Sequence, residues 1–176
     1  MSRSFAQENC AALADIKVSR AAHLELLNAL RKRQDVGTLV PNIKLDQVAQ
    51  DYACVLAASG HFDHIGPNGS TLATRAKTGG YQYCILAENI AHGQQNLVEA
   101  MKGWITSPGH WKNLKNADVT EIGFGVAYQI LAPGGPAKQK PSLSEFASRL
   151  NGETLPEKPI WRDYYWVQVF GRPCEN

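Results

Sequence analysis

Ser107 and His110 lie close together in the sequence, and a hydroxyl near an imidazole is the pairing that nucleophilic catalysis uses. Such chemistry also needs an oxyanion-hole donor and a third group that orients the base, and the sequence identifies neither. The chain also contains no Gly-rich phosphate loop and no Ser-nucleophile elbow. The residues alone therefore do not support a hydrolase.

The cysteines are the other residues with reactive side chains, and there are four of them: Cys10, Cys54, Cys84 and Cys174. They are widely spaced, with no CxxC pair and no Cys/His ligand pairing, which excludes the patterns of zinc fingers and thioredoxin-like proteins. Two disulfides or four buried thiols remain, and disulfides are favoured.

Amphipathic helices are expected to position these residues. Apolar residues recur at three- and four-residue spacing between Leu45 and Leu56, which predicts a helix that ends near Gly60. Similar reasoning predicts helices over 19–33, around 72–76, from Asn96 (with Glu99 as its capping partner) to about 107, and a turn of helix over 110–115.

Strands are predicted over 84–88, 121–128 and 164–170 from apolar runs and period-two alternation. The stretch 129–163 between the last two is rich in Pro, Gly and Lys, which indicates a surface insertion. A capping box at Ser142 predicts a small helix inside it. The element order predicts one α+β domain over 1–176, with an antiparallel sheet flanked by helices.

Charge and hydropathy exclude further classes of protein. The formal net charge of +2 is too weak a bias for a nucleic-acid-binding protein, and no apolar run approaches the roughly 20 residues that span a bilayer. Residues 1–9 lack the apolar centre of a signal peptide. The chain is therefore either a mature secreted form with an added Met or a cytosolic protein.

Six motifs in series resemble the CAP superfamily, the cysteine-rich secretory, antigen 5 and pathogenesis-related proteins, in its bacterial SCP-like form. They are the helical residues Leu27-Asn28, Arg31 and Leu45-Ala49-Ala53, the turn Phe62-Asp63-His64 with Asn68-Gly69-Ser70 and Arg75, the strand Ala87-Glu88-Asn89-Ile90-Ala91, Trp104 with Ser107-Pro108-Gly109-His110 and Asn113, and the strands 120–125 and 165–171. The resemblance implies an α-β-α sandwich and an extracellular or periplasmic location, which strengthens the expectation of disulfides.

The resemblance also implies a site. In this family a cavity gathers two histidines and two acidic residues that can hold a divalent metal, and three of these positions correspond to His64, Glu88 and His110. Two imidazoles and a carboxylate suit zinc and leave coordination positions for water or a ligand. The same residues could instead polarise a water as acid and base.

The chain departs from the family pattern at Ser107, where eukaryotic members carry the second acidic residue. A metal such as zinc is therefore expected to bind weakly, unless His61, Asp63 or His92 completes the site. A further interpretation stays open, in which Glu88 and the two histidines form a hydrogen-bonded network that joins helix, strand and loop.

The sequence thus predicts a secreted, non-enzymatic CAP-like binding or effector protein whose His/Glu cavity binds a divalent metal or small ligand. The partner is a protein, a lipid or a small molecule, with the insertion as a contact surface. The alternative is a metal-assisted, peptidase-like hydrolase that uses the same cavity.

A disulfide pairing follows if His64 and Glu88 meet in the cavity. Cys54 lies roughly 15 Å back along helix and turn, and Cys84 roughly 13 Å back along a strand. If both elements run the same way, the two sulfurs lie within bridging range. This predicts a bond between Cys54 and Cys84, and another between Cys10 and Cys174 near the two chain ends.

Overall fold

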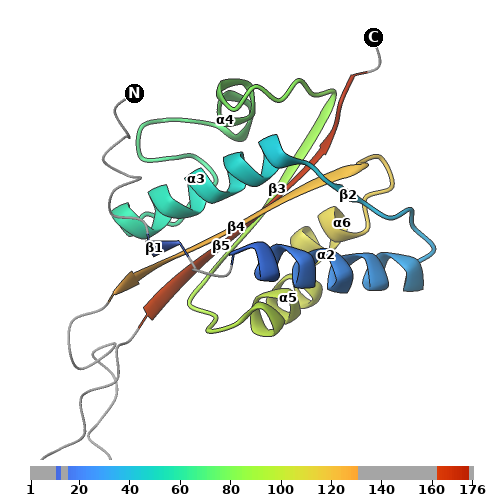
Figure 1. Ribbon diagram of the computed structural model, residues 1–176, viewed down its shortest axis with the longest axis horizontal. Coiled ribbons are helices and arrows are strands. Elements are labelled where there is room, and N and C mark those ends of the chain that lie inside the picture. The colour runs from blue at the N-terminus through green and yellow to red at the C-terminus, as the bar shows by residue number, and fades with distance from the viewer. Residues whose placement is uncertain (1–10, 13–15, 131–161, 175–176) are drawn as a thin grey trace, which may run out of the picture.

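The computed structural model describes residues 11–12, 16–130 and 162–174, which form three layers with a sheet in the middle (Figure 1). Helices α2 (Ile16–Arg33), α5 (Leu97–Thr106) and α6 (Pro108–Leu114) cover one face of the sheet. Helices α3 (Ile43–Ser59) and α4 (Leu72–Thr78) cover the other face. The predicted α+β class and α-β-α sandwich are confirmed.

The sheet is built on three long strands, β3 (Ile85–His92), β4 (Glu121–Ile130) and β5 (Arg162–Arg172). Strand β5 lies between the other two and is antiparallel to both, so β3 is an edge strand. Two short strands, β1 (Ala11–Ala12) and β2 (Val40–Pro41), pair with β4. Because β2 runs parallel to β4, the predicted antiparallel sheet carries one short parallel addition.

The helix ends follow from local capping chemistry. The side chain of Asn42 accepts hydrogen bonds from the first backbone N–H groups of α3, and Gly60 ends this helix with a φ of 65°. Asn96 caps α5 by accepting from the backbone N–H of Glu99, as the capping residues predict. The cap at Gly60 fixes where the loop after α3 begins, and that loop carries His64.

Two glycines of β4 allow α3 to lie directly on the sheet. A Cβ atom at Gly123 would fall 2.0 Å from the backbone carbon of Leu45, and one at Gly125 would fall 2.4 Å from that of Ala49. No side chain fits in either space, so the backbones of helix and strand touch only because both positions are glycine.

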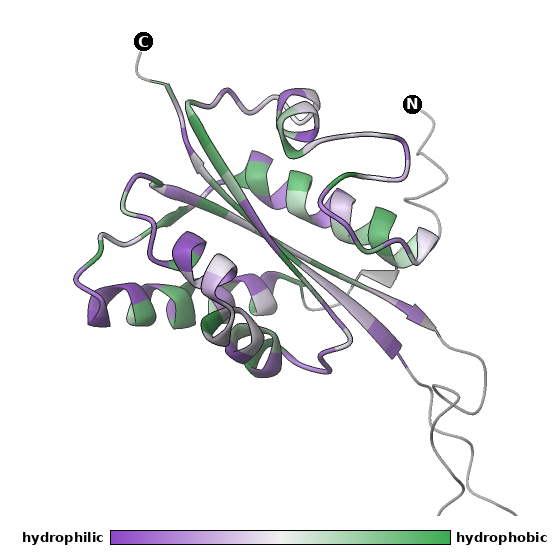
Figure 2. Cartoon of the chain, turned by 180° about the vertical axis from the view of Figure 1, so that it is seen from behind, coloured by the Kyte–Doolittle hydropathy of each residue, from purple (hydrophilic) through white to green (hydrophobic). Residues whose placement is uncertain are grey.

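In the described part of the chain the core consists of two apolar clusters, one on each face of the sheet. Leu56, Tyr81 and Val169 belong to the cluster under α3 and α4, and Leu27, Trp104 and Trp166 belong to the cluster under α2, α5 and α6. The helices carry both hydrophobic and hydrophilic residues around their circumference, as amphipathic covering helices must (Figure 2). Within the described part of the chain, no helix is both long and apolar enough to cross a membrane.

The predicted disulfide pairing is wrong, because Cys84 is bonded to Cys174, with their Cα atoms 4.8 Å apart. The backbone N–H of Cys84 donates to the carbonyl of Arg172 across the β3–β5 pair. This antiparallel register places Cys174 beside Cys84, whereas the prediction followed α3 and β3 and left β5 out.

The predicted oxidation is confirmed for the three cysteines that the structure describes. Cys54 is disulfide-bonded, and Cys10, the fourth cysteine, lies outside the described residues. Most of the expected insertion at 129–163, including the small helix predicted after Ser142, also lies outside the described residues. Of that stretch the structure describes only the two strand ends, residues 129–130 and 162–163.

Candidate functional site

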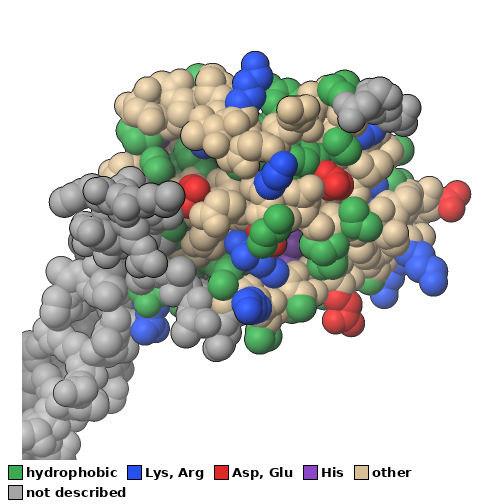
Figure 3. Space-filling view, turned by 45° about the horizontal axis from the view of Figure 1, so that its top comes forward, with side chains coloured by type: hydrophobic (Ala, Val, Ile, Leu, Met, Phe, Trp, Pro, Cys, Tyr) green, Lys and Arg blue, Asp and Glu red, His purple; other side chains and the backbone are tan. Residues whose placement is uncertain are grey.

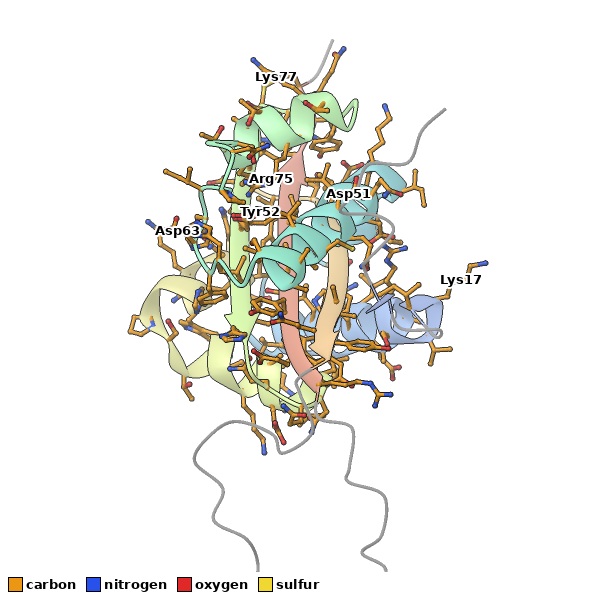
Figure 4. All side chains as sticks on the ribbon, turned by 90° about the vertical axis from the view of Figure 1, so that its left-hand side faces the viewer. Lys17, Asp51, Tyr52, Asp63, Arg75 and Lys77 are labelled. Carbon is orange, nitrogen blue, oxygen red and sulfur yellow. A yellow bond between two sulfur atoms is a disulfide. The ribbon has the colours of Figure 1, made fainter. Side chains whose placement is uncertain are left out.

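The candidate site lies at the edge strand β3, where Glu88 is buried. The loop 60–71, which joins α3 to α4 and is called the histidine loop below, approaches Glu88 from one layer. Helix α6 approaches the same strand from the other layer. Figure 4 shows Tyr52, Asp63 and Arg75 beside this strand, on the side that α3 and α4 cover.

Each carboxylate oxygen of Glu88 is bound by a different cationic or ionisable side chain. His64 donates Nδ1–H to Oε1 over 2.9 Å, and Arg75 donates from Nη2 to Oε2 over 2.7 Å. The Glu88 side chain is only 3% exposed, while that of His64 is 54% exposed. A buried carboxylate needs such partners because burial without them is costly.

The histidine loop is held in place by bonds of its own. The hydroxyl of Tyr52 donates to the carbonyl of Asp63, and Asp63 Oδ1 accepts from the backbone N–H of Ile65 over 2.9 Å. Arg75 Nη1 donates to the carbonyls of His64 and Ser70 over 3.2 Å and 2.9 Å. His64 is therefore presented by a loop whose backbone is fixed to α3 and α4.

Helix α6 is attached to β3 by a pair of asparagines. Asn113 Nδ2 donates to the carbonyl of Glu88 over 3.1 Å and to Asn89 Oδ1 over 2.8 Å. Asn89 Nδ2 in turn donates to the carbonyl of His110 over 3.3 Å. These bonds bring His110 to the part of β3 that carries Glu88.

The histidines of the site have shifted pKa values in opposite directions. The hydrogen bond to Glu88 raises the pKa of His64, so this imidazole holds its proton more firmly than a free one. Burial, and then the nearby charge of His64, lower the pKa of His110. Burial raises the pKa of Tyr52 to about 12, so its hydroxyl keeps the proton that it donates to Asp63.

A buried polar chain continues from the site through the sheet to α2. Asn89 Nδ2 also donates to Gln168 Oε1 over 2.9 Å, and Gln168 Nε2 donates to His23 Nε2 over 2.7 Å. His23 is stacked on Phe124 with ring centroids 4.2 Å apart. Because its Nε2 accepts a hydrogen bond, His23 is neutral, and burial lowers its pKa to about 3.

Of the residues predicted for the site, the structure brings His64 directly onto Glu88 and His110 into their neighbourhood. The other candidates have different surroundings. Ser107 joins α5 to α6 without a side-chain bond to the α6 N-terminus, and His61 bonds the carbonyl of Ile65 in its own loop. Asp63 bonds within the same loop, and His92 bonds Asp163 of β5 over 2.7 Å.

The described residues do not fit a divalent metal in this arrangement. Both oxygens of Glu88 are engaged, one by an imidazole and the other by a guanidinium. In the part of the chain that the structure describes, no three His, Cys, Asp and Glu side chains form a group that could hold a metal ion. Zinc binding by His64, Glu88 and His110 therefore stays a prediction, which a binding measurement must test.

Sequence reasoning missed Arg75 as a member of the site. Glu88 is a charged residue buried in β3 beside uncharged neighbours, and a carboxylate buried there requires a cation. Arg75 is the one arginine between residues 34 and 148, which is the signal that could have identified it. Gln168 and His23 carried no comparable signal, because each is a single polar residue in an apolar stretch.

Solved structures of other proteins share the fold. An extracellular protein from Bacillus anthracis that contains an SCP domain aligns with a TM-score of 0.65 and 23% identity, over 89% of this chain and 41% of its own. An outer surface protein from Borrelia burgdorferi aligns with a TM-score of 0.64 and 20% identity, over 92% of this chain and 95% of its own. At these identities the likeness shows the fold alone.

Two curated proteins of Bacillus subtilis are related in sequence. The uncharacterized protein YkwD is 34% identical over 102 residues, and the uncharacterized membrane protein YlbC is 29% identical over 103 residues. Each match covers 58% of this chain but only 40% and 30% of the relatives' own lengths. The model of the cysteine-rich secretory protein family, CAP, matches residues 24–129, which include His64, Glu88 and His110. The chain belongs to the CAP family.

Proposed function

We propose that this chain is an extracellular binding protein, which recognises a peptide or protein at the surface around His64 and does not convert it chemically. The extracellular location is supported by membership of a family named for secretory proteins and by the disulfide-bonded cysteines Cys54, Cys84 and Cys174. Disulfides persist in oxidising compartments and are rare in the cytosol.

The state of Glu88 is the observation that carries the non-catalytic proposal. A hydrolase that used this site would need Glu88 as a base or metal ligand, yet both oxygens are bonded and the side chain is 3% exposed. Among the described residues, neither His64 nor His110 hydrogen-bonds a Ser, Thr or Cys side chain, so no nucleophile is paired with a base.

The histidine loop supplies the binding surface. Phe62 and Ile65 are 45% and 54% exposed, and in the sequence they lie on either side of His64, whose side chain is half exposed. Phe62 also contacts the ring of His92, with centroids 5.4 Å apart. Large apolar side chains that are exposed on a fixed loop suit recognition, because such a loop loses little conformational entropy when it binds a partner.

The charge distribution supports a partner other than nucleic acid. On the described residues of the face in Figure 3, lysine and arginine side chains are interspersed with acidic and apolar ones. A nucleic-acid-binding protein would instead gather its basic residues in a stripe or patch.

A random peptide library tests the proposal, with cleavage followed by mass spectrometry and retention measured on the immobilised protein. We expect peptides to be retained intact, with and without added zinc. Phe62→Ala should lower retention several-fold, because it removes an exposed apolar contact. Val18→Ala truncates an apolar side chain of α2 that is 68% exposed, and this control should leave retention unchanged.

Peptide cleavage that disappears in Glu88→Gln and His110→Ala would overturn the proposal in favour of a hydrolase. Equal retention by the Phe62→Ala variant and the wild-type protein would show instead that the histidine loop is not the binding surface.

A further inference from the structure

Arg75 is bonded to one of the two carboxylate oxygens of Glu88 that a metal ion at this site would use. Its Nη2 lies 2.7 Å from Glu88 Oε2, and its side chain is only 10% exposed. The other oxygen of Glu88 is taken by His64 at 2.9 Å. The full negative charge of this buried carboxylate is therefore already matched from within the chain.

The guanidinium is fixed by contacts that do not involve Glu88. Its Nη1 donates to the carbonyls of Ser70 and His64, and its Cζ lies 3.4 Å from the centroid of the Tyr52 ring. Tyr52 belongs to α3, and Ser70 and His64 belong to the histidine loop. An incoming cation would have to break these contacts as well as the ion pair, because the arginine has no free rotation here.

Charge and donor count both act against a metal at this place. The positively charged guanidinium lies 2.7 Å from Oε2, and it repels a second cation bound to the same carboxylate. The remaining donors are the imidazoles of His64 and His110, which do not complete a metal-binding group in the described residues.

We propose that Arg75 is the resident cation of the Glu88 site and keeps divalent metals out of it. The arginine takes the structural part that a metal could play, because it joins the histidine loop and α4 to the edge strand. The site then works without a metal, whichever ligand it binds.

Removal of the arginine charge should therefore create metal affinity. In Arg75→Met the buried Glu88 loses its cation, and a divalent ion becomes able to supply the missing charge at the Glu88 carboxylate, beside the imidazole of His64. Zinc affinity, measured by calorimetry at pH 7.5, should rise by about tenfold or more over wild type. Zinc should also raise the melting temperature of this variant and leave that of the wild-type protein nearly unchanged.

Two further variants separate the charge from the rest of the side chain. Arg75→Met combined with Glu88→Gln retains both histidines but no carboxylate, so the gained affinity should disappear. Arg75→Lys keeps a positive charge and should gain no zinc affinity. Where Arg75→Met does not fold, Arg75→Gln removes the charge and retains an amide that can bond the carbonyl of Ser70.

Tight zinc binding by the wild-type protein that is lost in Glu88→Gln would overturn the proposal, and this result needs no arginine variant. Equal zinc affinity in the wild-type protein and a folded, charge-removed Arg75 variant would overturn it as well. Neither outcome depends on whether the protein binds peptides at the histidine loop.

Discussion

His23 is a titratable residue that the fold keeps neutral. It is fully buried, stacked on Phe124 and bonded through Nε2 to Gln168, and its pKa falls from 6.5 to about 3. Between these values the unfolded chain binds a proton at this residue and the folded chain does not. The free energy of unfolding should therefore decrease as pH falls from about 6.5 towards 3, by at most about 1.4 kcal/mol per pH unit.

Urea unfolding between pH 7.5 and 4 measures this slope in the wild-type protein and in His23→Gln. The glutamine variant should be less stable at pH 7.5 but should lose stability less steeply on acidification. His64 makes a suitable comparison, because its pKa is shifted upward whereas that of His23 is shifted downward. The stability that His64 adds is present at low pH and is lost as pH rises through its pKa. An unchanged slope in His23→Gln would contradict the assignment.

At the scale of single residues, the sequence predicted the contact between His64 and Glu88 but not the other hydrogen bonds around it. The contact followed from motif positions in the chain. The second oxygen of Glu88 could not be assigned in the same way, because its partner Arg75 lies on a short helix whose direction depends on the loop before it. The chain from Asn89 through Gln168 to His23 depends on strand register, which local patterns do not encode.

At the scale of secondary-structure elements, the close approach of α3 to β4 predicts that a larger residue at Gly125 destabilises the protein. Gly125→Ala would place a Cβ atom 2.4 Å from the backbone carbon of Ala49, and a helix backbone cannot yield as a flexible side chain can. We expect this change to lower the free energy of unfolding by about 2 kcal/mol or more, measured by urea denaturation.

Gly103→Ala in α5 is the control for that substitution. The nearest atom to its added Cβ would be Gln94 Nε2 at 3.9 Å, so the methyl group fits without a clash. Alanine is also the better helix former, and stability should rise by about 0.5–1 kcal/mol. If Gly125→Ala left the free energy of unfolding unchanged, α3 would be able to move away from the sheet at little cost.

The elements themselves were predictable because their signals are local. Alternation in 121–128 places Gly123 and Gly125 on one face of the strand, and the Asn96 cap marks the start of α5. The disulfide pairing was not predictable in this way. The bond between Cys84 and Cys174 follows from the register that pairs Ile85 with Arg172, and these residues are brought together only by the completed sheet.

At the scale of the whole molecule, the register of β4 and β5 predicts that the residues between them can be removed. Ile130 and Arg162 are directly paired, so a two-residue Asn-Gly turn in place of 131–161 can close an antiparallel hairpin. The site and both core clusters, as described, lie outside this stretch. The shortening spans about four halvings of loop length, which should add roughly 2 kcal/mol to the stability by loop-closure entropy alone.

Circular dichroism and thermal unfolding compare the shortened protein with the full chain, and we expect a native spectrum and an equal or higher melting temperature. A second variant that replaces 131–161 by a flexible Gly/Ser linker of the same length separates loop length from sequence, because it keeps the closure entropy and removes every specific contact. If both variants unfold, residues 131–161 pack as part of the core and are no insertion. If only the short turn fails, the hairpin cannot close at Ile130 and Arg162, and the twist of the two strands must continue beyond them.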